Sequence, residues 1–201
     1  MAAPTTPRRL DAEARRIQLI DAGVALARTT PVPQLTHERL AAEVGVSKGL
    51  LFHYFPTRDE LHAAIVQHTA DKLLASLAAN PDGAPFDQLG GGLDTFIEFI
   101  EEHRSSYVSL ARGSSNSRLL EIFEDTRMAI VDLIADRLGI VERTGLVVLA
   151  IRGWVAFAEE VILAWLDDDT IERDALRTFL VDSAVTLVGA AVIPIGAQVQ
   201  R

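Results

Sequence analysis

The sequence predicts an all-α fold of about nine helices, divided between a three-helix head with a helix-turn-helix and a larger helical C-terminal domain. Three observations predict this class. Apolar residues recur at spacings of three and four, as on one face of a helix. The alternation typical of strands is almost absent, and Pro, Gly and Ser divide the chain into segments of helical length.

The composition is that of a folded domain. The chain has 201 residues, of which 49% are apolar and 23% are charged, and it contains no cysteine. A disordered chain, a disulfide scaffold, a thiol nucleophile and cysteine-ligated zinc are therefore excluded, and a cytoplasmic location is expected. We expect no signal peptide. The uncharged stretch Ser183–Gln200 contains Pro194 and predicts a buried helix with a tail, so no contact with a membrane is expected.

Charge is unevenly distributed along the chain. The net charge is −9, yet residues 1–60 carry eight Lys/Arg and seven Asp/Glu, so all the negative charge lies beyond residue 60. This asymmetry suggests a division of labour between the two parts. It argues against a uniformly basic nucleic-acid binder and allows contact with DNA through the head alone.

The first helix is expected from about Leu10 to Arg28. Pro31 and Pro33 follow it and cannot continue a helix. One stripe of apolar or small residues would face the core. This stripe consists of Leu19, Ile20, Gly23, Val24 and Ala27.

Two short helices should follow, joined by a tight turn. Thr36 is the expected N-cap of a helix that ends at Val44, and Gly45 provides the left-handed residue of the turn. Ser47 should cap the next helix, which runs to about Tyr54 and stops before Pro56.

The rest of the chain divides into longer helices. The residues from Thr57 to Glu60 form a capping box that opens a helix to about Ala79. A Pro/Gly-rich linker follows, and further helices are expected near residues 86–104, 106–112, 117–138, 142–166 and 170–192. Gly90, Gly91 and Gly92 should delay or kink the first of these, because glycine weakens a helix interior. The run lacks the Gly-Lys-Ser/Thr of a phosphate-binding loop.

The two short helices fit a helix-turn-helix. Leu40, Ala41, Val44, Val46 and Leu51 are apolar where two crossed helices would touch. The second helix of such a pair can lie in the major groove of DNA, and its exposed face carries donors to phosphates or base edges. Any short helix pair joined by glycine shows the same pattern, so a helical enzyme or carrier with an accidental motif is the alternative.

A longer string carries more information. Residues 19–26 read LIDAGVAL, and residues 36–61 read THERLAAEVGVSKGLLFHYFPTRDEL. The order of first helix, turn, second helix, aromatic cluster and basic cap resembles the N-terminal domain of TetR-family transcriptional regulators over about residues 10–66, a third of the chain. The resemblance implies a DNA-binding domain at residues 1–57 and an effector-binding and dimerisation domain at residues 58–201.

The resemblance also implies a homodimer on a palindromic operator in double-stranded DNA, with a small-molecule effector. Carried over position by position, the resemblance implies that hydroxyl, ring and guanidinium groups contact phosphates. It also implies that residues at the start of the second helix face base edges or the nearby DNA backbone. The expected DNA-binding residues are Thr36, Ser47, Lys48, Gly49, Leu50, His53, Tyr54 and Arg58.

Three positions depart from the family pattern. Phe52 stands where the family often has Tyr, which puts a phosphate contact there in doubt. Ala27 stands where a large aromatic residue is usual, so the core must be filled differently. Prolines replace the common Gly-aromatic pair before the second helix, and His37 replaces an apolar residue. We expect His37 to be a surface or capping residue.

The C-terminal part offers candidates for an apolar effector pocket. They are Phe96, Tyr107, Phe123, Met128, Trp154 and Phe157, with plain core packing as the alternative for each. Possible polar anchors are Arg104, Tyr107, Asn116, Arg152 and Glu159. The last two helices are apolar around most of their circumference, which favours a dimer formed through both of them.

No cofactor, metal site or catalytic constellation is expected. The five histidines show no i, i+4 pairing, and no Ser/His/acid arrangement stands out. The sequence therefore predicts a transcriptional regulator, a repressor released by a small apolar effector rather than an enzyme, with activation as the alternative. The sequence does not reveal the effector, the operator or the regulated genes.

Overall fold

The computed structural model describes residues 11–79, 83–111, 116–167 and 170–192. Within these ranges all regular structure is helical, which confirms the predicted all-α class. The helices are α1 (Ala12–Ala27), the short 3-10 helix η1 (Val32–Gln34), α2 (His37–Val44), α3 (Lys48–Tyr54), α4 (Arg58–Ala78), α5 (Pro85–Ala111), α6 (Ser117–Arg137), α7 (Gly145–Trp165) and α8 (Arg173–Val192).

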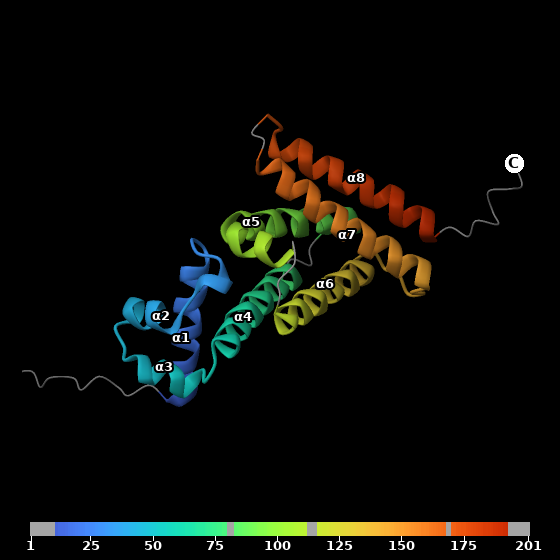
Figure 1. Cartoon of the computed structure of the whole chain (residues 1–201). Coiled ribbons are helices and arrows are strands. Elements are labelled where there is room, and N and C mark those ends of the chain that lie inside the picture. The colour runs from blue at the N-terminus through green and yellow to red at the C-terminus, as the bar shows by residue number, and fades with distance from the viewer. Residues whose placement is uncertain (1–10, 80–82, 112–115, 168–169, 193–201) are drawn as a thin grey trace, which may run out of the picture.

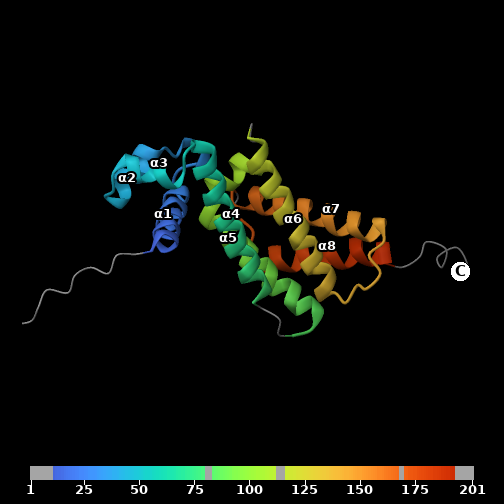
Figure 2. The ribbon, with the colours of Figure 1, turned by 90° about the horizontal axis from the view of Figure 1, so that it is seen from below.

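The helices form a small head and a larger body. Helices α1–α3 lie together at one end, and α4 leads from them into the body formed with α5–α8 (Figure 1). Figure 2 shows α7 and α8 side by side at the end of the molecule away from α2 and α3. The division at residue 57 remains a prediction, because α4 contributes buried side chains to the cores of both parts.

The head is held by the caps that the sequence predicts. The hydroxyls of Thr36 and Ser47 accept hydrogen bonds from the backbone N–H groups of Arg39 and Leu50, each at 3.2 Å. Gly45 has a φ of 71°, which side chains rarely tolerate, and it turns the chain from α2 into α3. Local chemistry thus fixes the angle between the two short helices.

Helix α1 packs directly on α4. A Cβ atom at Gly23 would lie 2.5 Å from Cδ1 of Ile65, which is itself fully buried. Only a residue without a side chain permits this approach. The head core that forms around this contact includes Leu19, Leu40, Leu51, Phe55 and Leu61, all of them almost inaccessible to solvent.

The break expected between the helices at 86–104 and 106–112 is present as a kink within one long helix. These two predicted helices form α5, which begins at Pro85 and departs from helical geometry at His103 (φ −113°, ψ 18°). The prediction that Gly90–Gly92 delays or kinks the helix is wrong. The space that glycine leaves there is used instead by arginines of two other helices, Arg177 beside Gly90 and Arg137 beside Gly92.

The prediction that His37 is a surface or capping residue is wrong. Its side chain is buried, and its Nε2 lies 2.7 Å from the carbonyl oxygen of Phe55, to which it donates. The ring stacks on Phe52 with a centroid distance of 4.2 Å. His37 therefore ties the start of α2 to the end of α3, because this hydrogen bond satisfies a polar group in the core.

Two other buried histidines make stability depend on pH. Burial lowers the pKa of His62 and of His103 below 6.5, although each ring bonds a backbone carbonyl. Below pH 6.5 the unfolded chain therefore binds protons that the folded chain does not, and we expect the free energy of unfolding to fall as the pH drops through this value. Urea unfolding above and below pH 6.5 measures this loss.

The matched variant for this measurement is His62→Gln. Glutamine can still donate to the Leu35 carbonyl that His62 contacts at 2.8 Å, but it does not titrate. The loss of stability on acidification should therefore be smaller in the variant. Equal losses in both proteins would show that His62 is not responsible.

Helix α8 is long and apolar enough to cross a membrane by length and composition alone. In the structure it packs against α7 and α5 through Leu176, Leu180, Ala184 and Val188, which are all buried. The helix thus packs one face against the body, while Phe179, Val185 and Leu187 on the rest of its surface are exposed.

Candidate DNA-binding surface and internal cavity

The predicted DNA-binding residues gather around α3. Ser47, Lys48, Gly49, His53 and Arg58 are exposed, whereas the other three are partly buried. These three are Thr36, Leu50 and Tyr54. The cap at Ser47 places the start of α3 at the surface, where Ser47, Lys48 and Gly49 are all exposed.

Lys48 contacts an acidic and an aromatic side chain at this surface. Its ammonium pairs with the carboxylate of Glu38 and lies 5.4 Å from the ring centroid of Phe52. The hydrogen bond from Lys48 lowers the pKa of Glu38 to about 2, so Glu38 is ionised. Since both partners of this pair are exposed, a phosphate can replace the carboxylate as the partner of Lys48 at little cost.

Arg58 has a structural partner as well. Its guanidinium donates to the carbonyl oxygen of Pro33, which connects the start of α4 to η1. A guanidinium carries five N–H donors, so this contact leaves capacity for a second acceptor. At the end of α3, the rings of His53 and Tyr54 meet edge to face with a centroid distance of 5.2 Å.

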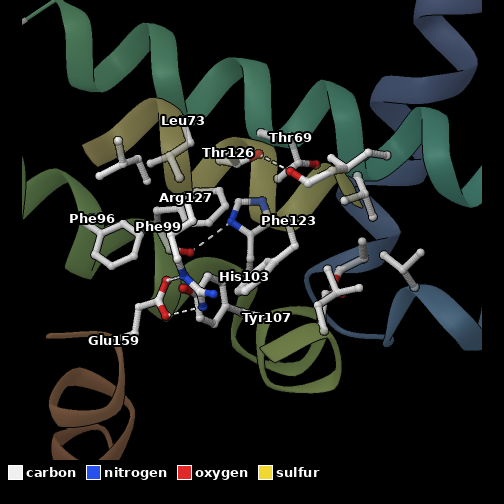
Figure 3. A pocket seen from close by; sticks show the side chains of 18 residues that line it. Thr69, Leu73, Phe96, Phe99, His103, Tyr107, Phe123, Thr126, Arg127 and Glu159 are labelled. Carbon is white, nitrogen blue, oxygen red and sulfur yellow. Dashed lines mark hydrogen bonds and ion pairs between the residues drawn. The ribbon is translucent and has the colours of Figure 1, made fainter. Parts of the chain in front are cut away.

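A cavity of about 70 Å³ lies where α4, α5 and α6 meet beneath the head. Figure 3 shows the rings of Phe96, Phe99, Tyr107 and Phe123 around it, with His103 among them. Ala27 at the end of α1 also lines the space. The small side chain that replaces the family's aromatic residue therefore leaves part of this cavity open.

One ion pair is set into the apolar wall of this cavity. Arg127 on α6 donates to Glu159 on α7 through Nη2 at 2.7 Å and Nε at 3.4 Å, and its Nη1 contacts Glu124 at 2.5 Å. Burial opposes the charge on Arg127, but the hydrogen bond and charge of Glu159, together with the charges of Glu124 and Tyr107, outweigh burial and raise the pKa of Arg127. Burial, followed by the Glu159 carboxylate, raises the pKa of Tyr107 well above its usual range.

Two further spaces adjoin this cavity. A second cavity of about 50 Å³ lies deeper in the body and shares Phe96 and Ile130 with the first, so these two side chains form the partition. On the other side, an open vestibule of about 300 Å³ is bordered by α1, α4 and α5. The vestibule shares His103 and Phe99 with the first cavity, which places these rings between the cavity and solvent.

The structure sorts the predicted pocket residues. Phe96, Tyr107 and Phe123 line the first cavity, and Phe96 and Trp154 line the second. Met128 and Phe157 line neither of these two cavities, so their role as lining residues stays a prediction. Met128 lies beside Arg152 at 3.9 Å, and Phe157 is 39% exposed.

Among the polar anchors, Glu159 and Tyr107 line the first cavity, whereas Arg104 pairs with Asp167 elsewhere. Sequence reasoning missed Phe99, His103 and Arg127. The spacing from Phe96 through Phe99 and His103 to Tyr107 repeats at three and four and could have revealed the first two.

Apolar side chains remain exposed on α7 and α8. Phe157 and Phe179 contact each other with ring centroids 5.9 Å apart, and Phe179 is 54% exposed. On the same side of α7, Gly153, Ala156 and Ala164 are exposed small residues. We refer to this set as the α7–α8 face. It leaves room for a partner helix to approach closely.

Among the described residues, no group of three His, Cys, Asp or Glu side chains could hold a metal ion. The charged groups of the first cavity bind one another.

Two family descriptions match this chain. "Bacterial regulatory proteins, tetR family" matches residues 19–65, and "Tetracyclin repressor-like, C-terminal domain" matches residues 85–187. Together the two matched ranges include α2 and α3 of the head and α5, α6 and α7 of the body.

Solved structures share the whole fold. A tetR-family transcriptional regulator from Streptomyces coelicolor is 27% identical, with a TM-score of 0.80 over 90% of this chain and 83% of that chain. The FadR regulator from Bacillus subtilis, solved in complex with stearoyl-CoA, has a TM-score of 0.61 over 88% of this chain and 99% of that chain. Its identity is 15%, so this likeness shows the fold alone.

Curated relatives are more distant. The nucleoid occlusion factor SlmA from Haemophilus influenzae is 23% identical over 113 residues, 52% of each chain, so this chain spans about half the length of that relative. An uncharacterized HTH-type transcriptional regulator of Mycobacterium tuberculosis is 23% identical over 176 residues, 83% of this chain and 74% of the relative. Because the second family description matches more than half of the chain, the chain belongs to the tetR family of DNA-binding transcriptional regulators.

Proposed function

We propose that the protein is a cytoplasmic repressor that binds a palindromic operator as a homodimer and is released from it by a small, largely apolar effector. In this proposal it has no enzymatic activity and no membrane contact. The observation that carries the proposal is the exposed set of donors around α3, in a head whose first helix ends at the wall of a cavity.

The DNA contacts follow from the surface of the head. Helix α3 would enter the major groove, which is wide enough for one α-helix. Lys48 and Gly49 would approach the base edges or the adjacent backbone, and Thr36 and Tyr54 would bind phosphates. The body carries the negative charge of the chain, so it would be repelled from DNA and confine binding to the head.

The homodimer would form through the α7–α8 face. A C2 interface uses one self-complementary patch, and the small residues of α7 beside the exposed Phe157 and Phe179 suit close helix packing. Two copies joined in this way form a four-helix interface. It would hold the two α3 helices roughly 34 Å apart, one turn of the duplex.

Release would follow from widening of the cavity. About 70 Å³ is small for an effector, since ligand pockets usually exceed about 300 Å³. A ligand must therefore separate α4, α5 and α6. The head is attached at this point, because Ser106 of α5 donates to the Ala27 carbonyl at 2.9 Å and Arg28 pairs with Glu102 at 2.5 Å. Movement of α5 would thus change the position of α1 and reduce operator binding.

The DNA contacts can be tested with single substitutions. Lys48→Ala and Tyr54→Ala should each weaken operator binding by about tenfold while folding and dimerisation are unchanged, since each removes a proposed contact with DNA, and the contacts of Lys48 within the chain are exposed. Fluorescence anisotropy with duplex DNA from beside its own coding region, at two salt concentrations, measures the affinity.

Glu38→Gln is the matched control on the same surface. It removes the carboxylate that competes for Lys48, so binding should be equal or stronger. If both alanine variants bind DNA like the original protein, or if binding shows neither sequence preference nor salt sensitivity, the proposed DNA contacts are wrong.

A further inference from the structure

We propose that the effector is an uncharged apolar molecule with one hydrogen-bond donor, such as a phenolic hydroxyl, that binds Nε2 of His103. This inference rests on the proposed function, in which the cavity beneath the head binds the effector. It adds the chemical class of ligand and the residue that selects it. Three observations about the cavity support it.

The first observation is an unpartnered nitrogen. His103 is 7% exposed and lines the cavity, and its Nε2 has no hydrogen-bond partner among the described residues. Its Nδ1 lies 3.1 Å from the carbonyl oxygen of Phe99 and 3.8 Å from the carboxylate of Glu102. Both oxygens accept only, so the proton resides on Nδ1 and Nε2 is left as an acceptor.

The second observation concerns the hydroxyl groups of the lining. Thr69 donates to Ile65 at 2.9 Å and Thr126 donates to Ile122 at 2.6 Å, in each case to a backbone carbonyl of its own helix. Ser106 donates to the Ala27 carbonyl. A hydroxyl has a single proton, so these three groups can only accept from a ligand. Figure 3 shows Thr69 and Thr126 on the α4 and α6 side of His103.

The third observation is that the charges in the wall are already matched. The guanidinium of Arg127 contacts the carboxylates of Glu159 and Glu124, and Tyr107 faces Glu159. An anionic ligand would have to compete with these carboxylates, and a cationic one would lack a free carboxylate. A buried charge without a partner costs several kcal/mol, as a general rule. A neutral donor satisfies Nε2 without this penalty.

Three small compounds of one shape test the inference. They are 4-ethylphenol, 4-ethyltoluene, in which a methyl group replaces the hydroxyl, and 4-ethylbenzoate. Titration calorimetry with the full chain should show at least tenfold tighter binding of 4-ethylphenol than of either other compound, as expected where a buried acceptor would otherwise stay unpaired. If burial of apolar surface alone decided affinity, the more apolar 4-ethyltoluene would bind more tightly. Tighter binding of 4-ethylphenol would therefore require a hydrogen bond.

The variant His103→Phe keeps a ring of similar size and removes the acceptor. This variant should lose the preference, so that 4-ethyltoluene binds at least as tightly as 4-ethylphenol. If circular dichroism shows that His103→Phe is unfolded, His103→Leu is used in its place. Ser105→Ala is the matched control. It removes the other buried side-chain atom without a partner among the described residues, two positions along the chain and outside the cavity lining, and should keep the preference.

The outcomes separate this inference from the proposed function. Equal or tighter binding of 4-ethyltoluene by the original protein overturns the hydrogen-bond inference and leaves an effector cavity in place. The same holds for an unchanged preference in both His103 variants. If none of the three compounds binds, the cavity does not accept small molecules, and the effector part of the proposed function fails as well.

Discussion

Arg127→Leu is expected to lower the free energy of unfolding by about 3–5 kcal/mol, because it leaves the carboxylate of Glu159 buried without its partner. Glu159 is only 7% exposed, and both of its oxygens accept hydrogen bonds from Arg127. Leucine has no donor and cannot replace them. Urea unfolding of the original protein and the variant, monitored by circular dichroism, measures the difference.

The double variant Arg127→Leu with Glu159→Leu is the control. Removing both charges also removes the burial penalty, so most of the lost stability should return. Additive losses in the double variant, or a loss below about 1 kcal/mol in the single one, would mean that the pair is not the buried contact described.

Phe179→Glu is expected to convert the proposed dimer to monomers and to weaken operator binding by about 100-fold or more. The carboxylate would enter the α7–α8 face, where the ring of Phe157 is the nearest aromatic group. Without dimerisation, the second DNA-binding head is no longer held next to the second half-site. The operator affinity gained from this high effective concentration is then lost. Sedimentation velocity and DNA binding measured on the same preparation test both effects.

Phe86→Glu is the matched control for the dimer. Phe86 is 48% exposed, close to Phe179 in accessibility, but it lies at the start of α5 outside the α7–α8 face. It should therefore leave dimerisation and operator affinity unchanged. A variant at Phe179 that stays dimeric and binds DNA normally would show that the subunits meet elsewhere.

The head could be predicted closely from local signals. Caps and left-handed glycines act within three or four residues, so Thr36, Ser47 and Gly45 fix α2 and α3 regardless of the rest of the fold. The burial of His37 could not be predicted in this way. Its acceptor, the carbonyl of Phe55, becomes available only where α3 ends against α2.

The cavity was harder to predict because it depends on packing between distant helices. Helix α7 is apolar around most of its circumference, so the sequence does not reveal that Trp154 faces the body and Phe157 faces outward. The Arg127–Glu159 pair joins residues 32 positions apart, and it depends on the register of α6 against α7. The kink at His103, by contrast, lies within two residues of the break predicted between the helices at 86–104 and 106–112.

Selection of bound sequences from a pool of random duplex DNA would measure the geometry of recognition directly. Two α3 helices related by a two-fold axis should enrich an inverted repeat, with half-site centres about 10 base pairs apart or a multiple of this. Enrichment of a single unrepeated motif, or of no sequence at all, would contradict a dimeric operator-binding regulator.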